Sequence, residues 1–390
     1  MFNGDQLAIA QIVRDHGPIS RADIARVLGM SPSTVGRLVD TLIVIGLLHE
    51  SGQRADRSTG RPAILLDFNS SISSVLSVDL RLTKAYAVIT DLNGKPLASK
   101  AQLLTVGDTR HSLEELFDLI EGLINTTIGL PPIKSIVIGA PSIVNVETGV
   151  IEWAPSLGWS DLPLRDLLEQ EFKVRVQVEN DVNLAALGEY WKGTGQAVRK
   201  NMVFVSVGTG IGAGIILDGK LYRGTSFAAG EVAYFITDVA VLRDNAWQVG
   251  NLESRVGQEG LIRMAQLVAQ RYPASKLTQY FNTPSDTIDT GTILRLAEDG
   301  DPAATVVFNE LVDILTIVIG NIAVVLDPEM IILGGPSDWD WARLTEAIRA
   351  RIGSALLRPI DLRPSRLGND AVIIGGAFNA LNLLKFTYQA

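Results

Sequence analysis

The stretch 20–42 reads SRADIARVLGMSPSTVGRLVDTL and contains the signals for two short helices joined by a turn. Ser20 stands where a capping side chain precedes the first helix, and Gly29 follows its last turn. Ser31 and Pro32 open the second helix with a cap and a proline at the first helical position. The apolar face of that second helix consists of Val35, Leu38, Val39 and Leu42. This pattern predicts a helix-turn-helix.

The flanking sequence adds the other parts of a DNA-binding head. An amphipathic helix is expected over 7–14, and two short apolar strands within 47–68 enclose the polar loop 51–61. We therefore predict a winged helix-turn-helix over 1–70. The helix that Ser31 and Pro32 open is expected to enter the major groove. The predicted contacts are Ser33, Thr34 and Arg37 to base edges, and Arg54, Arg57 and Arg61 to phosphates or the minor groove. The alternative is a small helical dimerisation domain with a solvated loop.

Charge and composition limit the classes of protein. The formal net charge is −9, but residues 1–68 hold seven arginines and seven acids, so the negative charge lies in the remainder. A neutral head on an acidic body fits DNA binding only modestly. Cysteine is absent and no signal peptide pattern opens the chain. We find no apolar run that we expect to cross a bilayer, so the prediction is a cytoplasmic protein with no membrane partner.

Beyond residue 70 the pattern changes to α/β. Helical stretches alternate with apolar strands, which favours sheets covered by helices. The expected strands include 75–79, 85–90, 136–138, 174–178, 203–207, 330–333 and 372–374.

Five segments then occur in order: GRPA at 60–63 with LLDFN at 65–69, ENDVNLA at 179–185, GTGIGAG at 208–214, AGE at 229–231 and ILGG at 332–335. Together they resemble the ROK family (repressors, open reading frames and sugar kinases) over nearly the whole chain. The resemblance implies a two-lobed, actin-like α/β domain with sugar held between the lobes. The expected domains are the head at 1–70, a smaller lobe from 71–185 with 370–390, and a larger lobe from 186–369.

The resemblance also implies a sugar site. Asn180 and Asp181 come at the end of a predicted strand, where ligands commonly bind in α/β folds. Carboxylates and amides suit sugar hydroxyls because they offer directional donors and acceptors. Asn180, Glu231 and Glu253 match sugar contacts of the family, and Asp181 matches the base of its kinases. The alternative is that these residues are strand-end caps and surface carboxylates.

The chain departs from the family at its metal site. The family's histidine after Ala-Gly-Glu falls on Tyr234, and the zinc-binding cysteines are missing from this chain. Zinc needs about four nitrogen, sulfur or oxygen ligands. We therefore predict no metal, and we keep Tyr234 in the sugar site as a residue that donates a hydrogen bond and stacks on a sugar ring.

A second departure lies in the nucleotide loops. Family kinases carry Asp-x-Gly-Gly-Thr-Lys after the first strand, whereas here Arg81 and Leu82 follow Asp79 and replace both glycines. Side chains there obstruct nucleotide phosphates. The second loop keeps Gly208, Thr209, Gly210 and Gly212. We interpret the surviving glycines as structural and predict no kinase chemistry and no cofactor.

The sequence thus favours a sugar-responsive transcription regulator, expected to be a repressor of carbohydrate genes. Its expected partners are a palindromic DNA operator, a sugar effector and further copies of itself in a homodimer or homotetramer. One alternative is an ATP-dependent sugar kinase with a DNA-binding head, in which Asp181 acts as the base. A second alternative is a regulator controlled by a protein partner.

Overall fold

The computed structural model describes residues 4–54, 63–198, 200–237, 250–282, 288–353, 356 and 358–381. The chain divides into two units. The first comprises Met1–Asp181 with Gly376–Ala390, and the second comprises Val182–Gly375. The lobe boundaries expected at 185/186 and 369/370 compare with unit boundaries at 181/182 and 375/376. The head and the smaller lobe both belong to the first unit.

The head forms as predicted. Its elements are α1 (Gly4–His16), β1 (Ile19–Ser20), α2 (Arg21–Leu28), α3 (Pro32–Val44), β2 (Leu48–Arg54) and β3 (Ala63–Phe68). The Ser20 and Ser31 side chains accept the backbone N–H groups of Asp23 and Thr34, and Gly29 ends α2 in the left-handed region. Ile9, Val13, Ile24, Val35, Leu38 and Leu42 are buried between the helices. The winged helix-turn-helix is confirmed.

One boundary in the head differs from the prediction. We expected a polar loop from residue 51, but β2 continues through Arg54 and pairs with β3, with Gln53 opposite Ile64. The polar side chains of this stretch do not prevent strand pairing because an antiparallel ribbon can face water. Arg57 and Arg61 lie outside the described residues.

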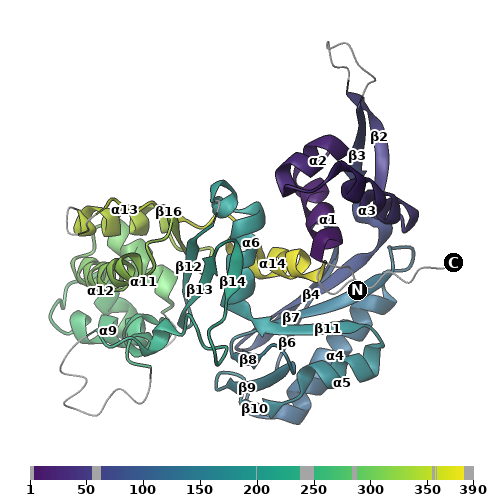
Figure 1. The fold of residues 1–390 in the computed structure, drawn as a ribbon. Helices are drawn as coiled ribbons and strands as arrows, with labels where there is room; N and C mark the ends of the chain where they lie inside the picture. Colours follow the sequence, from purple (N-terminus) through teal and green to yellow (C-terminus); the bar gives the residue numbers. More distant parts are fainter. Residues whose placement is uncertain are drawn as a thin grey trace. The chain divides into compact units, whose positions relative to one another are not determined.

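The remainder of the first unit is a five-stranded sheet with the order β11-β7-β4-β5-β6. Its strands are β4 (Ser74–Arg81), β5 (Lys84–Asp91), β6 (Pro96–Leu103), β7 (Ile133–Ala140) and β11 (Arg175–Asn180). Helices α4 (Thr109–Asn125) and α5 (Leu164–Phe172) cover one face (Figure 1). A small three-stranded sheet contains β8 (Ile143–Asn145), β9 (Val150–Ala154) and β10 (Trp159–Leu162).

Alternation along β4 explains the two faces of this sheet. Leu76, Val78 and Leu80 are buried in one core with Leu116, Leu119 and Leu123 of α4. Ser77, which lies between them, points to the other face, as the period of a strand requires. There a Cβ at Gly376 would lie 3.0 Å from the Ser77 Cβ. The sheet therefore packs against α4 on one face and against the end of α14 (Ala371–Ala380) on the other.

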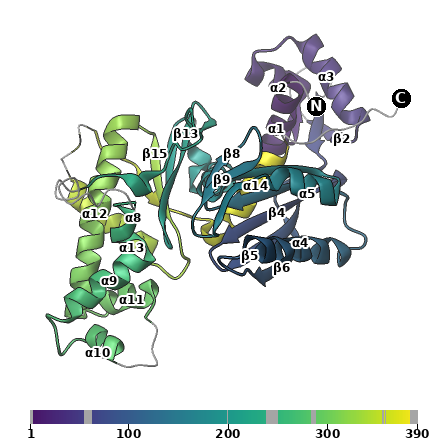
Figure 2. The ribbon, with the colours of Figure 1, turned by 90° about the horizontal axis from the view of Figure 1, so that it is seen from below.

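The second unit has a five-stranded sheet with the order β14-β13-β12-β15-β16. The strands are β12 (Met202–Val207), β13 (Ile211–Leu217), β14 (Lys220–Tyr222), β15 (Met330–Gly334) and β16 (Leu362–Pro364). The helices are α6 (Asp181–Lys192), α8 (Glu253–Val256), α9 (Gln258–Ala269), α10 (Lys276–Asn282), α11 (Thr290–Glu298), α12 (Pro302–Leu326) and α13 (Trp341–Ile352). Figure 2 shows α9, α11, α12 and α13 gathered in one layer. Their buried side chains join Val203, Val205 and Val207 of β12 in one core.

The strand predicted at 372–374 is wrong, because these residues belong to α14. A short run of Val and Ile favours a strand, but periodicity alone does not separate a buried strand from a buried helix. The next two residues, Gly375 and Gly376, lack Cβ atoms and let the helix backbone approach its neighbours closely.

Helix α12 also corrects an expectation. Its 25 residues have a mean hydropathy of 1.8 in their most apolar window, so the helix is long and apolar enough to cross a membrane by length and composition. Polar residues interrupt its apolar run, so the sequence pattern alone does not single it out. Val307, Leu311, Val318 and Ile322 lie in the core of the second unit. On the opposite side Glu310 and Asp313 pair with Arg255 and Arg351. The exposed side also carries Ile317, Val324 and Val325, and 39% of the apolar window is buried. Helix α12 thus has one face in the core and an exposed face that is partly apolar.

Candidate functional site

The N-terminal turn of α3 presents the predicted base-reading residues. Ser33 and Arg37 are exposed and stand one helical turn apart, so they share a face. The Thr34 hydroxyl lies 2.8 Å from the Ser31 hydroxyl and takes part in the cap of the helix. No ion pair holds the Arg37 guanidinium among the described residues. The Ser33 hydroxyl also lies 3.0 Å from the Ser31 hydroxyl. Arg37 is therefore the available side chain of this turn, whereas the Ser33 and Thr34 hydroxyls both contact the capping residue.

Other charged residues of the head form ion pairs within it. Arg21 binds Asp40 at 2.9 Å and Glu50 at 3.2 Å, and Arg26 binds Asp23 at 2.9 Å. These pairs neutralise both arginines locally. Of the predicted wing arginines, Arg54 is the last residue of β2.

In the first unit, Asn180 and Asp181 lie where the central sheet ends. Asn180 is the last residue of β11, and Asp181 is the first residue of α6. The Asn180 side-chain nitrogen donates to the Ser142 carbonyl oxygen at 3.1 Å, which fixes the amide. The sequence analysis missed Ser142. Ser142 follows β7, and the carboxyl end of β7 lies beside that of β11. The parallel pairing of these two strands is therefore the signal that places Ser142 near Asn180.

The β4–β5 turn lies at the same edge of this sheet. Asp79 pairs in register with Gly139 of β7, which itself pairs with Glu179 of β11. One strand thus separates Asp79 from the Asn180 end of β11, a distance of about 10 Å at ordinary strand spacing. The structure brings these two predicted positions to one edge of one sheet.

An ion pair occupies the Asp79 carboxylate. Asp79 is 3% exposed, and one of its oxygens accepts the Arg81 Nε at 2.7 Å and lies 2.6 Å from another Arg81 nitrogen. Burial raises the pKa of Asp79, and the Arg81 charge acts in the opposite direction. Arg81 therefore binds the acid two residues before it and neutralises that buried carboxylate. Leu82, in the turn, is 38% exposed.

In the second unit, three further predicted sugar residues lie close to the β12–β13 turn. Glu231 immediately precedes the 3-10 turn Val232–Tyr234, and the Tyr234 side chain is 52% exposed. Glu253 opens α8, and one of its carboxylate oxygens accepts the Ile211 N–H at 3.2 Å. Burial, and then the charge of Glu253, raise the pKa of Glu231. Two acids therefore interact in this unit, one of them held on the glycine-rich turn.

Each glycine of the segment 208–214 has a neighbour from the protein itself. A Cβ at Gly208 would lie 3.1 Å from the ring of Pro336, and one at Gly210 would overlap the Glu253 carboxylate. A Cβ at Gly212 would lie 3.0 Å from the Val182 side chain, and one at Gly214 would overlap the Ala186 Cβ. The segment is also not a single loop, because Ile211–Leu217 forms β13. Gly212 and Gly214 thus let α6 pack on a strand.

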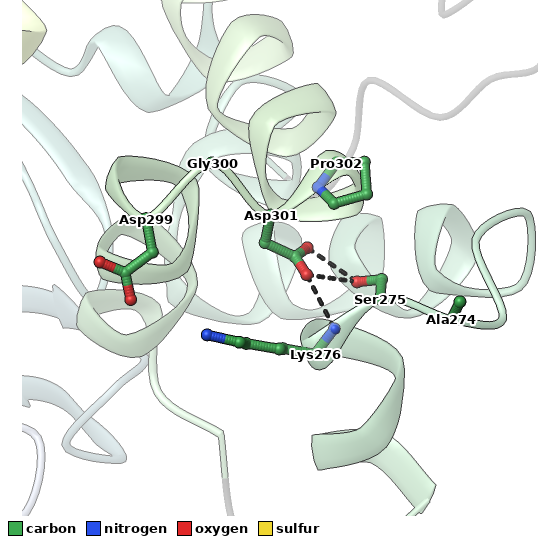
Figure 3. Close-up of a pocket in the computed structure, with 7 residues that line it drawn as sticks. All are labelled: Ala274, Ser275, Lys276, Asp299, Gly300, Asp301 and Pro302. Atoms are coloured by element: carbon green, nitrogen blue, oxygen red, sulfur yellow. Dashed lines mark hydrogen bonds between the residues drawn. The ribbon is translucent and has the colours of Figure 1, made fainter.

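Two other features of the structure bear on metal and ligand binding. Among the described residues no group of three or more His, Asp or Glu side chains is placed to bind a metal, and 238–249, which includes most of the family's zinc segment, lies outside them. A cavity of about 260 Å³ is lined by Ser275, Lys276 and Asp301 (Figure 3). The Asp301 carboxylate accepts the Ser275 hydroxyl at 2.7 Å and the N–H groups of Lys276 and Ala304, so it is the cap of α12. None of the predicted site residues lines this cavity.

Comparison with known proteins places these features in a family. The model of the ROK family matches residues 75–382, and the model of the IclR helix-turn-helix domain matches residues 9–52. The xylose repressor of Caldicellulosiruptor bescii is 29% identical over 95% of this chain and 94% of that protein. A glucokinase of Halalkalibacterium halodurans is 34% identical over 62% of this chain and 74% of that protein.

A solved structure agrees over nearly the full length. The crystal structure of a ROK family transcriptional regulator, a homologue of E. coli Mlc, superposes with a TM-score of 0.84 at 27% identity. The match covers 97% of this chain and 96% of that one. With the family model spanning most of the chain and the head matched separately, the protein belongs to the ROK family.

Proposed function

We propose that this protein is a sugar-responsive transcriptional repressor that binds a palindromic operator as a homodimer or homotetramer and does not transfer phosphate. The observation that carries the proposal is that one chain contains both a winged helix-turn-helix and an Asp79 carboxylate bound by Arg81. Full-length relatives named as xylose repressors support it.

On the DNA side, α3 would lie in the major groove with Ser33 and Arg37 toward base edges. An arginine binds guanine through two parallel hydrogen bonds, and each such pair contributes about 1–3 kcal/mol of discrimination. The arginines Arg54, Arg57 and Arg61 would contact phosphates or the minor groove, and these contacts make affinity depend on salt.

On the sugar side, the proposed contacts are Asn180, Asp181, Glu231, Tyr234 and Glu253. Amide and carboxylate groups bind the hydroxyls, and the exposed Tyr234 ring offers a face for stacking. Names of relatives indicate a pentose or hexose, with D-xylose as the first compound to test. Sugar reduces operator affinity only if it binds one conformation of the protein better than the other.

The absence of phosphoryl transfer rests on the two turns that family kinases use for nucleotide. Phosphate needs glycines that leave space and backbone amides that point into it. Here Arg81 and Leu82 fill the first turn, and packing within the protein accounts for the glycines of the second. Asp181 would then bind sugar without acting as a base.

Exchange of Arg37 for alanine tests the DNA side. We expect Arg37→Ala to weaken binding of an operator, selected from random duplexes with the wild type, by about 10- to 100-fold. Affinity for D-xylose should not change. The matched control is Arg110→Ala, which removes the same charge from a 90% exposed side chain on α4. Equal operator binding by Arg37→Ala and wild type would contradict the assigned recognition helix.

The alternative function is an ATP-dependent sugar kinase with a DNA-binding head. Similarity to a glucokinase and the position of Asp181 at the start of α6 favour it. Its test is ADP formation from ATP in the presence of D-glucose or D-xylose. Sugar-dependent ADP formation that disappears in Asp181→Asn would establish the kinase. Its absence in the wild type, together with sugar binding, would support the repressor.

A further inference from the structure

One helix contributes residues to both units of the chain. Helix α14 begins at Ala371 in the second unit and ends at Ala380 in the first, and the unit boundary falls between Gly375 and Gly376. Helix α14 is therefore one continuous helix that connects the two units of the chain.

The start of α14 packs tightly against α6. A Cβ at Gly375 would overlap the Leu184 carbonyl oxygen, and a Cβ at Gly188 would overlap the Ala371 carbonyl oxygen. Both glycines thus mark backbone-to-backbone contact between the two helices. Closely packed interiors transmit strain because they have little free space.

A buried carboxylate adds a second connection. Glu189 of α6 has no exposed surface, and one of its oxygens accepts the Ser365 hydroxyl at 2.6 Å and the Leu367 N–H at 2.8 Å. The other oxygen accepts the Thr194 N–H at 2.7 Å. Residues 365–367 lie just before α14, so Glu189 holds the approach to α14 against α6. Helix α6 and the start of α14 thus form one body within the second unit, and the end of α14 belongs to the first unit.

The far end of α14 contacts the DNA-binding head. The Arg14 guanidinium of α1 lies over the ring of Phe378, 5.0 Å from the ring centre, and its Nε binds Asp15 at 3.0 Å. The Arg14 side chain has no exposed surface. A cation on an aromatic ring is held more strongly when water is excluded, so this contact is a specific link between the head and α14.

We propose that Arg14 and Phe378 are positioning residues through which the body formed by α6 and α14 sets the DNA-binding head. The inference rests on the proposed function, because the signal it transmits is sugar binding at Asp181, the first residue of α6. Sugar binding displaces α6, α14 follows, and the Arg14–Phe378 contact changes the placement of α1. The head of a variant without this contact no longer responds to sugar.

The test measures operator affinity of the full chain by fluorescence anisotropy, with and without saturating D-xylose, and sugar affinity by calorimetry. In the wild type we expect D-xylose to weaken operator binding at least fivefold. In Arg14→Met, which nearly keeps the side-chain length, the ratio should fall below twofold while D-xylose affinity stays within twofold. The matched control is Arg343→Met, which removes an arginine that lies over Phe308 at 4.4 Å in the second unit; it should keep the full ratio.

A second variant tests the inference if Arg14→Met does not fold. If Arg14→Met does not bind operator at all, Phe378→Leu replaces the ring and leaves the Arg14–Asp15 pair, and the same loss of response is expected. A variant that binds operator and keeps the wild-type ratio overturns the inference alone. A wild type that binds D-xylose with no effect on operator binding contradicts the proposed function and, with it, the coupling role of Arg14.

Discussion

Two strand-to-strand turns of this protein differ in their glycine content and in the residues that they contact. At the β4–β5 turn, where the resemblance to family kinases predicts glycines, Arg81 ends β4 and Leu82 follows it, and Arg81 binds the buried Asp79. The β12–β13 turn keeps Gly208 and Gly210, and these face Pro336 and Glu253. The comparison teaches that a glycine motif has two physical causes, close approach of a ligand and close packing of the chain itself. Only the neighbours of each glycine distinguish them.

The largest expected effect comes from adding a methyl group on the glycine-rich strand. Gly214→Ala places a Cβ against Ala186 and the Val182 backbone, neither of which can yield, so we expect a loss of about 2–3 kcal/mol in the free energy of unfolding of the second unit. The matched control is Gly320→Ala on α12, where a Cβ meets nothing within 4 Å. That change should stabilise the unit by up to about 1 kcal/mol. Urea unfolding measures both, and equal shifts would contradict a packing role for Gly214.

The second largest expected effect concerns the ion pair beside the β4–β5 turn. Arg81→Met leaves the buried Asp79 without its cation, and we expect a loss of about 2 kcal/mol at pH 7, less than for a fully buried pair because Arg81 is 42% exposed. Burial already raises the pKa of Asp79, and removing Arg81 raises it further. A raised pKa in the folded state means that protonation stabilises the fold, so the deficit should shrink as pH falls through that pKa.

The double variant Asp79→Asn with Arg81→Met is the control for this charge effect. It removes the ionisable group as well, so its stability relative to wild type should vary less with pH than that of Arg81→Met. A deficit of Arg81→Met that stays constant as the pH is lowered from 7 to the ordinary pKa of an Asp carboxyl would show that the Asp79 charge is not its cause.

The smallest expected effect sharpens the same comparison. Leu82→Gly introduces a glycine in an exposed turn and should change stability by less than about 0.5 kcal/mol. Because Arg81 remains, we expect no shift of the melting temperature with magnesium ATP in either wild type or variant. A shift gained by the variant would mean that Leu82 alone excludes nucleotide from this turn.

The sequence predicted the head best, because its signals are local. Capping by Ser20 and Ser31 and the turn at Gly29 involve residues within one helical turn of each other. The existence of β4 and β11 also followed from short apolar runs, but their ends did not: β4 continues two residues past the expected end at 79, and β11 two residues past 178. The roles of the glycines did not follow either, because Gly214 meets Ala186 and Gly375 meets Leu184 through contacts between separate elements.

For the same reason α14 was mistaken for a strand at 372–374. Three apolar β-branched residues fit either a strand or a buried helix, and packing against α6 and β4 decides between them. The ion pair of Asp79 with Arg81 was within reach of the sequence, since the two residues lie on the same face of a strand two positions apart. The prediction for this turn used the size of the Arg81 and Leu82 side chains and not the charge of Arg81.

The central claim is that sugar alone, without ATP, changes the affinity of this protein for DNA. The most direct measurement titrates a selected operator duplex with the full chain at fixed D-xylose or D-glucose, with ATP absent and then present, while ADP is assayed in the same samples. We predict that one sugar weakens operator binding to the same extent with and without ATP and that no ADP forms. Operator binding that responds only when ATP is present, with ADP formed, would contradict the claim.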